Sequence, residues 1–441
     1  IGAVLRGDSG LTSVVRIIAG GPADKNGKLK VKDQIIGVDK TKDEDDSFID
    51  IVDLDLREVV SYIRGEKGTT VRLKVLRGGK EIIIPIVRDE IKLEDQAVKW
   101  TTFQVGPYQI GLIDLPSFYI DFRGRLIGKE NYRSSTRDMK KALTELKKKK
   151  VDLVILDLRA NGGGSLDAAV DITGLFTGKG PVVLVKKKGA EAVSRDYYED
   201  PFYSKSLIVL VDRLSASASE ILARAIKVYG RGIIVGETTH GKGTVQSLIP
   251  LGSEAIKVTV RKFYGPLGSS TQKKGVKPDI EFVSVSDIYG IGEAHYPGAL
   301  EWSQIKPRKI KNFGEVEPYK AKLKAQSLAR VNKSEKFEEI RKAIEKYKND
   351  PNRDKISLKE SKKSKEERKK REEEEKKLEK LASEESGKEF KPNLNEDPVL
   401  LETLRISGDY LLLQRKKKLK TLKIANYVPT KKEKKVEKRT D

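Results

Sequence analysis

The chain has 441 residues, of which 37% are hydrophobic and 35% are charged, and its formal net charge is +23. This length allows two or three domains, and the composition suggests folded regions joined to a strongly solvated one. The sequence has no cysteine and two histidines, which excludes disulfides, thiolate metal sites and a cysteine nucleophile and leaves little for a histidine-rich metal site. The composition therefore predicts neither a metal nor another cofactor.

Residues 1–88 predict a small β-rich domain with the following elements: strands at Val14–Ile18 and Asp33–Val38, a short helix after Gly20–Pro22, a helix at Leu56–Ile63, and strands at Val71–Val75 and Ile82–Ile86. The last two strands alternate apolar and polar residues around Gly78-Gly79, which is typical of a β-hairpin. The helix has one apolar face. The acidic insertion Asp39–Asp50 is expected to be a solvated loop.

Residues 89–305 alternate strands with helices, and this order predicts an α/β domain. The expected strands are Ile110–Leu115, Val151–Leu156, Val182–Val185, Leu207–Val211, Ile233–Val235, Ala255–Tyr264 and Ile280–Val283. The expected helices are Arg137–Lys149, Ser165–Leu175 and a segment that follows the serines at 215–219.

Residues 306–441 form a charged and mostly helical region. Residues 316–350 predict helix, and a linker is expected near residues 350–392, within which Lys359–Leu381 fits either an exposed helix or a disordered segment. Asp397 followed by Pro398 predicts a helix start. The apolar residues beyond it are expected to dock onto a partner surface: Leu400, Leu401, Leu404, Tyr410 and Leu411.

The excess of positive charge invites comparison with nucleic-acid-binding proteins. The long lysine runs contain almost no aromatic residues, so they offer no platform on which bases can stack. We therefore predict no nucleic-acid function. A solvated surface explains most of the charge, and the basic segments Arg415–Lys420 and Lys431–Lys438 predict a peripheral contact with anionic lipid.

The residues with the clearest chemistry lie between Val211 and Gln246. Ser215, Ser217 and Ser219 precede a segment with helical spacing, so a serine lies at a helix N-terminus, where free N–H groups face a developing oxyanion. Lys242 lies between two glycines, where desolvation can lower its pKa until it acts as the general base of a serine nucleophile. Taken alone, such a pattern is more often a helix N-cap beside a solvated loop.

A glycine run forms the second chemical element. Val151–Leu156 is a continuous apolar strand, and Asp157–Gly164 follows it with three consecutive glycines before a helix that begins near Ser165. Consecutive glycines let backbone N–H groups turn toward a ligand. The lack of a Gly-Lys-Ser/Thr motif after them disfavours a phosphate-binding loop. A tight turn and an anion-binding loop remain as interpretations.

Six motifs occur in the order of one protease family: Ile1–Leu5, Gly21–Ala23, Asp157–Gly164, Ser215–Glu220, Gly241–Gln246 and Gly275–Asp279. With them the chain resembles the tail-specific, or C-terminal processing, serine proteases over residues 1–285, and more loosely beyond. The resemblance implies an α/β and α+β multidomain protein. Its parts are an N-terminally truncated PDZ domain with a β-barrel-like fold at 1–88, a crotonase-like α/β protease core at 89–305, and the helical, charged C-terminal region at 306–441.

The resemblance also implies roles for single residues. The implied catalytic residues are Ser217 as nucleophile, Lys242 as general base and Gln246 as the amide that orients the lysine. The implied oxyanion donors are the N–H groups of Ala218 and of either Gly163 or Gly164.

Three further positions complete this interpretation. Ser215 and Ser219 become structural, because they are expected to bond backbone groups at the helix entry. Some relatives carry an acidic residue in the helix after the nucleophile, but Val228 stands at the matching position, so no third carboxylate is expected.

The implied peptide groove lies between the strand after the first residues and the helix Leu56–Ile63. Its residues are Ile1, Gly2, Ala3, Val4, Leu56 and Val60. A groove of this kind takes a peptide end as an additional strand, and loop N–H groups hold the terminal carboxylate. The predicted partners are therefore protein substrates with apolar C-termini, besides an adaptor or lipoprotein. Residues Ile1–Val4 resemble this carboxylate-binding loop. Because the chain begins inside the loop and without methionine, we expect a preceding segment. The family resemblance implies a location on the periplasmic or cell-envelope side of a bacterium.

The predicted function is that of a serine endopeptidase. One alternative concerns its general base, and two concern the function itself. His240 is a rival general base, but no carboxylate partner is indicated for it, and we interpret it as a loop residue near the cleft. A catalytically inactive PDZ-containing adaptor is disfavoured by the intact Ser217, Lys242 and Gln246. A crotonase-type acyl-CoA enzyme is disfavoured by the PDZ-like module and by the serine–lysine pair.

Overall fold

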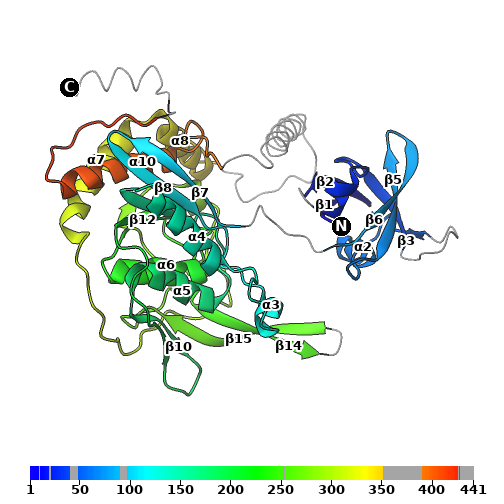
Figure 1. The fold of residues 1–441 in the computed structure, drawn as a ribbon, viewed down its shortest axis with the longest axis horizontal. Helices are drawn as coiled ribbons and strands as arrows, with labels where there is room; N and C mark the ends of the chain where they lie inside the picture. Colours follow the sequence, from blue (N-terminus) through cyan, green and yellow to red (C-terminus); the bar gives the residue numbers. More distant parts are fainter. Residues whose placement is uncertain are drawn as a thin grey trace. The chain divides into compact units, whose positions relative to one another are not determined.

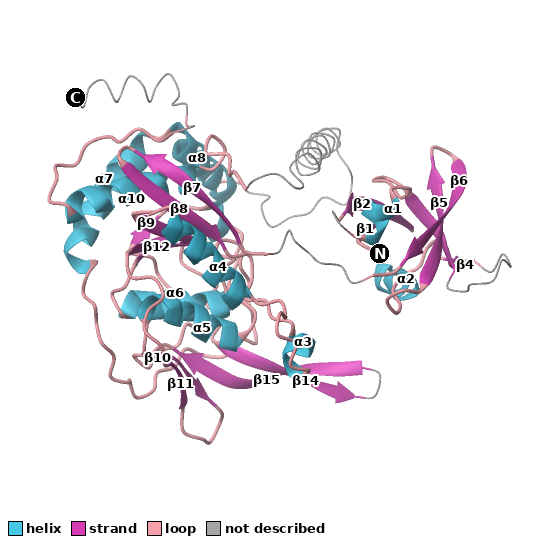
Figure 2. Cartoon of the chain, viewed as in Figure 1, coloured by secondary structure: helices cyan, strands magenta, loops and turns pink. Residues whose placement is uncertain are grey.

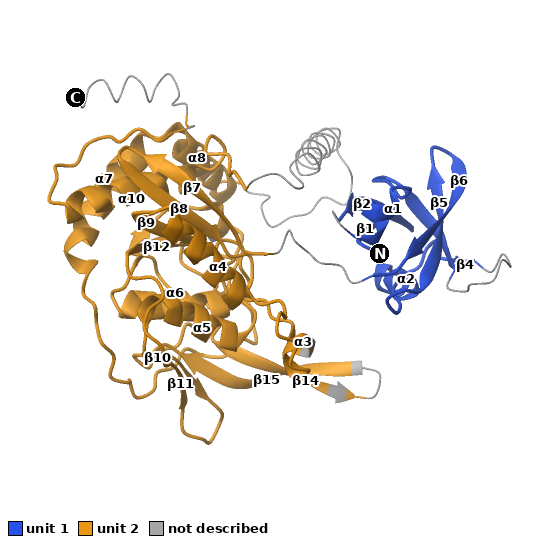
Figure 3. Ribbon diagram, in the orientation of Figure 1, with its two compact units in different colours: residues 1–96, 357–389 blue, residues 97–356, 390–441 orange. Residues whose placement is uncertain are grey.

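The computed structural model describes residues 1–8, 10–18, 21–39, 48–89, 97–251, 254–350, 390–425 and 427. The described residues divide into two compact units (Figure 3): unit 1 ends before residue 97, and unit 2 begins at Ala97. Most of the predicted linker near residues 350–392, with the segment Lys359–Leu381, lies outside the described residues.

Unit 1 is a small β domain (Figures 1 and 2). Its elements are β1 (Ala3–Asp8), β2 (Leu11–Ile17), α1 (Pro22–Asn26), β3 (Gln34–Asp39), β4 (Ile49–Asp50), α2 (Leu56–Ile63), β5 (Thr70–Arg77) and β6 (Lys80–Val87). The sheet has the order β1-β2-β3-β5-β6, and β4 pairs with β3. The predicted hairpin is β5–β6, in which Gly78 and Gly79 have φ values of 57° and 80°. A two-residue turn with positive φ at both positions matches the twist of the strands.

The N-terminal residues differ from their expected conformation. Ala3 and Val4, predicted within a loop, belong to strand β1. The helix α2 has the predicted bounds, and the side chain of Asp55 caps it by accepting a hydrogen bond from the Arg57 N–H. Of the acidic insertion, residues 40–47 lie outside the described residues, and the following Ile49–Asp50 is strand β4 rather than loop.

Unit 2 contains a six-stranded and a four-stranded sheet. Its elements are β7 (Lys99–Val105), β8 (Tyr108–Asp114), α3 (Phe122–Leu126), α4 (Ser135–Lys148), β9 (Leu153–Asp157), α5 (Leu166–Thr177), β10 (Gly180–Lys186), β11 (Val193–Tyr197), β12 (Ser206–Val211), α6 (Ala218–Val228), β13 (Ile233–Gly236), β14 (Thr244–Leu251), β15 (Glu254–Tyr264), β16 (Ile280–Glu281), η2 (Val285–Asp287), η3 (Glu293–His295), α7 (Glu317–Lys333), α8 (Glu335–Lys348) and α10 (Pro398–Gln414). The larger sheet has the order β16-β13-β12-β9-β8-β7, in which β7 alone among the described strands runs antiparallel to its neighbour.

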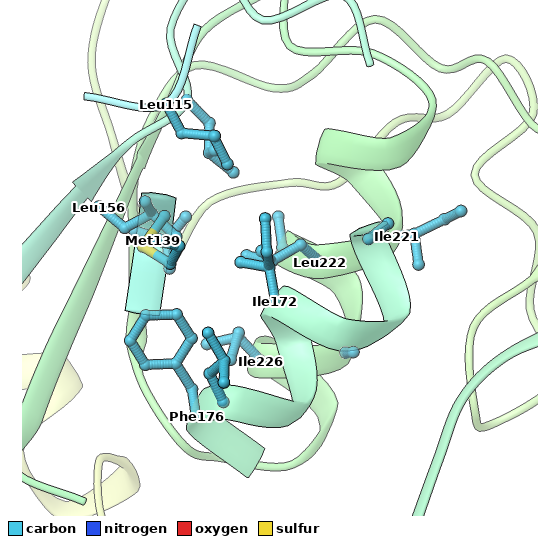
Figure 4. Packing of buried hydrophobic residues seen from close by; sticks show 14 of the residues in the cluster. Leu115, Met139, Leu156, Ile172, Phe176, Ile221, Leu222 and Ile226 are labelled. Atoms are coloured by element: carbon cyan, nitrogen blue, oxygen red, sulfur yellow. The ribbon is translucent and has the colours of Figure 1, made fainter. Parts of the chain in front are cut away.

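Both faces of the larger sheet are covered by helices. Along β9, Val154 and Leu156 belong to one hydrophobic cluster, with α4, α5 and α6, whereas Leu153 and Ile155 belong to a second, with α7, α8 and α10. Successive side chains of a strand point to opposite faces, so a continuous apolar strand is buried on both sides. Figure 4 shows the first cluster close by. The alternation of strands and helices thus correctly predicted an α/β domain, and the larger of its sheets is mainly parallel.

The smaller sheet has the order β11-β10-β15-β14. Its strands β14 and β15 form a long antiparallel ribbon that extends beyond the helices of unit 2 (Figure 1). Strand β14 begins two residues after Lys242, so this ribbon is continuous with the loop that carries the predicted base.

The C-terminal residues pack onto the chain's own core rather than onto a partner surface. Leu400, Leu404 and Tyr410 of α10 are buried in the second cluster, with Ile155 and Ile208 of the larger sheet. The predicted domain limits at residues 88 and 305 remain predictions. Among the described residues no helix is long and apolar enough to cross a membrane, and the basic segment Lys431–Lys438 lies outside that part of the chain.

An ion-pair cluster fastens α7 to α10. Arg330 of α7 donates to Glu402 at 2.8 Å and to Asp409 at 2.7 Å. Both carboxylates are buried, with side-chain exposures of 3% and 8%. Burial raises the pKa of both carboxyl groups, and the Arg330 guanidinium opposes that shift.

Replacing Arg330 with Leu is expected to destabilise unit 2 by about 3 kcal/mol, because two buried carboxylates lose their counterion. Urea unfolding followed by circular dichroism measures the change. The matched control is Arg341→Ala, which removes a partly exposed ion pair with Glu338 on α8 and is expected to cost about 0.5 kcal/mol or less. Equal losses in the two variants would contradict a special role for the buried cluster.

Candidate active site

The predicted nucleophile lies in a sharp turn between β12 and α6. Ser217 is the residue before α6 and has φ 56° and ψ −109°. Positive φ is unfavourable for a residue with a Cβ, and it persists only where the surroundings over-determine the conformation, which is common at active sites. Ser217 is half-buried, while Ala218, Ser219 and Glu220 after it are buried.

Hydrogen bonds tie this serine turn to the glycine loop that follows β9. The hydroxyl of Ser215 donates to the Leu158 carbonyl, and that of Ser219 donates to the Asn161 carbonyl, both at 2.8 Å. The Ala216 N–H also donates to the Asn161 carbonyl, at 3.0 Å. The two flanking serines are therefore structural.

The predicted base lies in the loop between β13 and β14. Lys242 is half-buried, between the buried Gly241 and Gly243. The preceding residue, His240, donates its N–H to the Ser215 carbonyl at 3.0 Å. The lysine loop is thereby fixed against the serine turn.

A buried carboxylate, Glu220, joins the two loops. One oxygen, Oε2, accepts hydrogen bonds from the Ser217 N–H at 2.9 Å and the Lys242 N–H at 2.8 Å. The other oxygen, Oε1, accepts from the Gly241 N–H and the Thr239 hydroxyl, both at 2.7 Å. The backbones of the predicted nucleophile and base are thus held by the same side chain, which is 0% exposed.

Sequence reasoning missed the role of Glu220 and considered position 228 instead. A signal was present, because Ser217-Ala218-Ser219-Glu220 has the Ser-x-x-Glu spacing of a capping box, in which the glutamate accepts from the N-cap N–H. The additional bonds to the lysine loop depend on the tertiary fold and have no counterpart in that local pattern.

The electrostatics of the site affect both titrating groups. Burial raises the pKa of Glu220 to about 7, against four hydrogen-bond donors that favour the carboxylate. Burial also lowers the pKa of Lys242, the charge of Lys257 lowers it further, and Glu293 and Glu220 oppose the shift. A lysine with a lowered pKa reaches its neutral, basic form at a lower pH than a free lysine.

The glycine loop lies against the serine. A Cβ atom at position 163 would lie 2.9 Å from the Ser217 Cβ and 3.1 Å from the Ala218 nitrogen, so only glycine fits there. The Gly163 N–H already donates to the Asn161 side chain at 2.9 Å. Among the described residues, the N–H groups of Gly164 and Ala218 have no hydrogen-bond acceptor.

Neither Gln246 nor His240 has a side-chain hydrogen bond to Ser217 or Lys242 in the described structure. The Gln246 amide donates to the hydroxyls of Thr244 and Thr259, and no hydrogen bond joins it to Lys242 in the described structure. The His240 Nε2 lies 3.9 Å from the Glu293 carboxylate, and burial lowers its pKa.

The candidate peptide groove in unit 1 lies beside an edge strand. Strand β1 ends the sheet, with β2 as its partner, so its other edge is open to a further strand among the described elements. Gly2 has φ 79°, and its carbonyl accepts from the Ile18 N–H at 2.9 Å. On α2, Leu56 and Val60 remain half-buried, whereas Val59 is fully buried in the core.

Comparison with known proteins agrees with these features. Three family models match the sequence: "PDZ domain" over residues 1–76, "Peptidase family S41" over residues 109–282, and "C-terminal domain of tail specific protease" over residues 287–412. The fold and the site therefore define a PDZ domain joined to a family S41 serine-type peptidase fold with a helical C-terminal region.

Individual relatives identify the family more closely within this class. The tail-specific protease of Haemophilus influenzae is 38% identical over 354 residues, which cover 76% of this chain and 48% of that protein. The carboxy-terminal processing protease CtpB of Bacillus subtilis is 32% identical over 298 residues, which cover 66% of this chain and 56% of that protein. The chain belongs to the family of tail-specific, or C-terminal processing, proteases.

The coverage of these relatives is partial. The chain spans about half the length of the curated relatives it matches. Among solved structures, the photosystem II D1 C-terminal processing protease matches with a TM-score of 0.38 and 27% identity, over 64% of this chain and 72% of that one.

Replacing Glu220 with Gln is expected to lower kcat on the order of 10²-fold with little change in KM, because misplacing the nucleophile or base by about 1 Å has such an effect. The glutamine amide group cannot accept from the N–H groups that the second carboxylate oxygen binds. Steady-state proteolysis of casein measures both constants. An unchanged kcat in a folded variant would show that the shared carboxylate is not needed to hold the site.

Proposed function

We propose that the chain is a serine endopeptidase in which Ser217 is the nucleophile and Lys242 the general base. The observation that carries the proposal is the Glu220 carboxylate, whose single oxygen Oε2 binds the backbone N–H groups of both residues. The pKa of Lys242, which burial and the charge of Lys257 lower, supports its role as a general base. No observation on the described residues favours the alternative of an inactive adaptor.

The proposed reaction follows from these positions. Lys242 removes the proton from the Ser217 hydroxyl as its oxygen attacks the scissile carbonyl. The oxyanion accepts hydrogen bonds from the N–H groups of Ala218 and Gly164, which have no other acceptor among the described residues. The protonated lysine then gives its proton to the leaving amine, and water releases the acyl group by the reverse sequence.

The proposed role of Gln246 in this mechanism depends on bound substrate. We propose, from the family resemblance, that its amide orients the Lys242 amine when substrate is bound. Its present partners are the hydroxyls of Thr244 and Thr259, at 3.1 and 3.4 Å. The second of these bonds is long enough to be exchanged for the lysine.

We further propose that the PDZ domain selects substrates by an apolar C-terminus. A peptide end would pair with the open edge of β1 and place its last side chain against Leu56 and Val60, whose half-buried surfaces support this role. Protein substrates are the proposed partners, with an adaptor or lipoprotein as a further one, and the proposed location is the cell envelope of a bacterium. Of the basic segments proposed for peripheral contact with anionic lipid, Arg415–Lys420 is the described one.

Replacing Ser217 with Ala is expected to reduce casein hydrolysis by roughly 10⁴–10⁶-fold, as loss of a catalytic nucleophile does. The activities of Lys242→Ala and Lys242→Arg should fall similarly, because alanine has no basic group and arginine stays protonated. His240→Ala is the control and should retain most activity. If His240→Ala abolished turnover and Lys242→Ala did not, the base assignment would be wrong.

The same base predicts a pH profile. Activity should rise with pH as Lys242 loses its proton, and the rise should occur below the ordinary lysine pKa because that pKa is lowered. Lys257→Gln removes a positive charge near Lys242. Its removal favours the protonated form of Lys242, so the rise in activity should move to higher pH. Measurements of kcat/KM between pH 6 and about 10 test this shift. A profile that does not move in Lys257→Gln would contradict it.

Substrate selection has its own test, which uses two peptides of identical sequence with an apolar last residue. One peptide carries a free C-terminal carboxylate and the other an amide. The free peptide should bind about tenfold more tightly or better, because only it offers a charged acceptor to the loop N–H groups. Fluorescence anisotropy with the Ser217→Ala protein measures both affinities without cleavage. Equal affinities would mean that the domain does not recognise the chain end.

A further inference from the structure

An arginine at the start of the glycine loop lies between two carboxylates from distant parts of the chain. Arg159 donates through Nη2 to Asp157 at 2.7 Å, and through Nη1 and Nη2 to both oxygens of Asp397 at 3.0 and 2.7 Å. Its Nε also donates to Asp157 at 3.1 Å. Two planar pairs of this kind fix the orientation of the guanidinium as well as its position.

The partner Asp397 comes from the C-terminal region. It is the N-cap of α10, where its Oδ1 accepts from the Leu400 N–H at 2.8 Å. Helix α10 packs in the second hydrophobic cluster, on the sheet face opposite to α6. Arg159 therefore joins helix α10, which covers one face of the sheet, to the glycine loop that follows strand β9.

The loop beyond Arg159 runs directly to the proposed oxyanion donors. The Ala160 N–H donates to both oxygens of Asp212, at 3.0 Å each. Asn161 then donates to the Leu115 carbonyl and accepts from the Gly163 N–H. The chain is thus anchored at its start by Arg159, and hydrogen bonds at Ala160, Asn161 and Gly163 hold the segment that leads to Gly164.

Carboxylates lie on two sides of Arg159, so the charge of Asp397 affects where the guanidinium is held. Asp114 and Asp157 are paired neighbours at the ends of the parallel strands β8 and β9. Burial raises the pKa of Asp157, and burial together with the Asp157 charge raises that of Asp114 to about 6. Without the Asp397 charge, Arg159 would be attracted only toward these strand ends.

We propose that Asp397 is a positioning residue for peptidase activity, which holds Arg159 and thereby sets the glycine loop that carries the oxyanion donors. The docking of α10 then controls the catalytic site from the opposite face of the sheet. This inference rests on the proposed function, because it assigns the glycine loop to the oxyanion.

The substitution Asp397→Asn separates the ion pair from the helix cap. Asparagine caps a helix as well as aspartate, but it is neutral and cannot pair with both guanidinium nitrogens through two acceptor oxygens. In the full chain, kcat for casein should fall on the order of 10-fold with KM unchanged, since the change displaces a transition-state donor rather than the peptide. The melting temperature should stay within about 2 °C, because the cap remains.

The matched control is Arg415→Gln at the other end of the same helix. Arg415 follows α10 and pairs with Asp152 at 2.9 Å, so this variant also removes one ion pair between α10 and the sheet. Its kcat should equal that of the unmodified chain. An equal loss in both variants, or full kcat in Asp397→Asn, would overturn the proposal.

A double-mutant cycle tests whether the effect passes through the arginine. Arg159→Gln should lower kcat, and adding Asp397→Asn should cause no further loss, since residues of one network are not additive. If the losses in kcat of the two single variants multiplied in the double variant, the residues would act independently and the proposal would be overturned. Ser217→Ala, assayed alongside, keeps the two questions apart: activity that survives it refutes the proposed function, whereas serine-dependent activity that is unchanged in Asp397→Asn refutes this inference alone.

Discussion

The candidate site depends on one buried carboxylate. Glu220 is fully enclosed, and its two oxygens accept four hydrogen bonds from the serine turn and the lysine loop. In a low-dielectric interior such bonds are strong, and an unpaired member would be costly, so the four donors are held to one arrangement. That arrangement explains how Ser217 keeps a backbone conformation that serine otherwise avoids. The strain is local, and the network that compensates for it spans two loops.

The sheet supplies the second constraint. The glycine loop follows β9, the serine turn follows β12 and the lysine loop follows β13, and these three strands are parallel neighbours. In parallel sheets, the carboxyl ends of neighbouring strands meet at one edge, where ligands bind. Three segments that are far apart in sequence are therefore brought to one place by the strand order alone. The helices on both faces make that edge rigid, because every interior position of β9 is packed.

Much of this could be predicted from the sequence. The strand β9 was recognisable from its continuous apolar run and the helix α2 from its one apolar face, because both are local patterns. The serine and lysine motifs were recognisable because they belong to a family pattern. Glu220 was missed because its partners in the lysine loop lie about twenty residues away and leave no periodic signal. The covering of the second sheet face by α10 was also missed. Apolar spacing shows that a helix packs against some surface, but it does not show whether that surface belongs to the same chain or to a partner. The role of Gln246 and the limits of the domains remain predictions.

The place of α10 has a consequence for biosynthesis. A ribosome makes the strands of the larger sheet long before it makes residues 398–414, which cover the face that contains Ile155 and Ile208. During that interval the nascent chain has its serine and lysine but an incomplete hydrophobic core. An apolar face without its cover is unstable as a separate fold, so the enzyme's maturation is coupled to the synthesis of its C-terminal region.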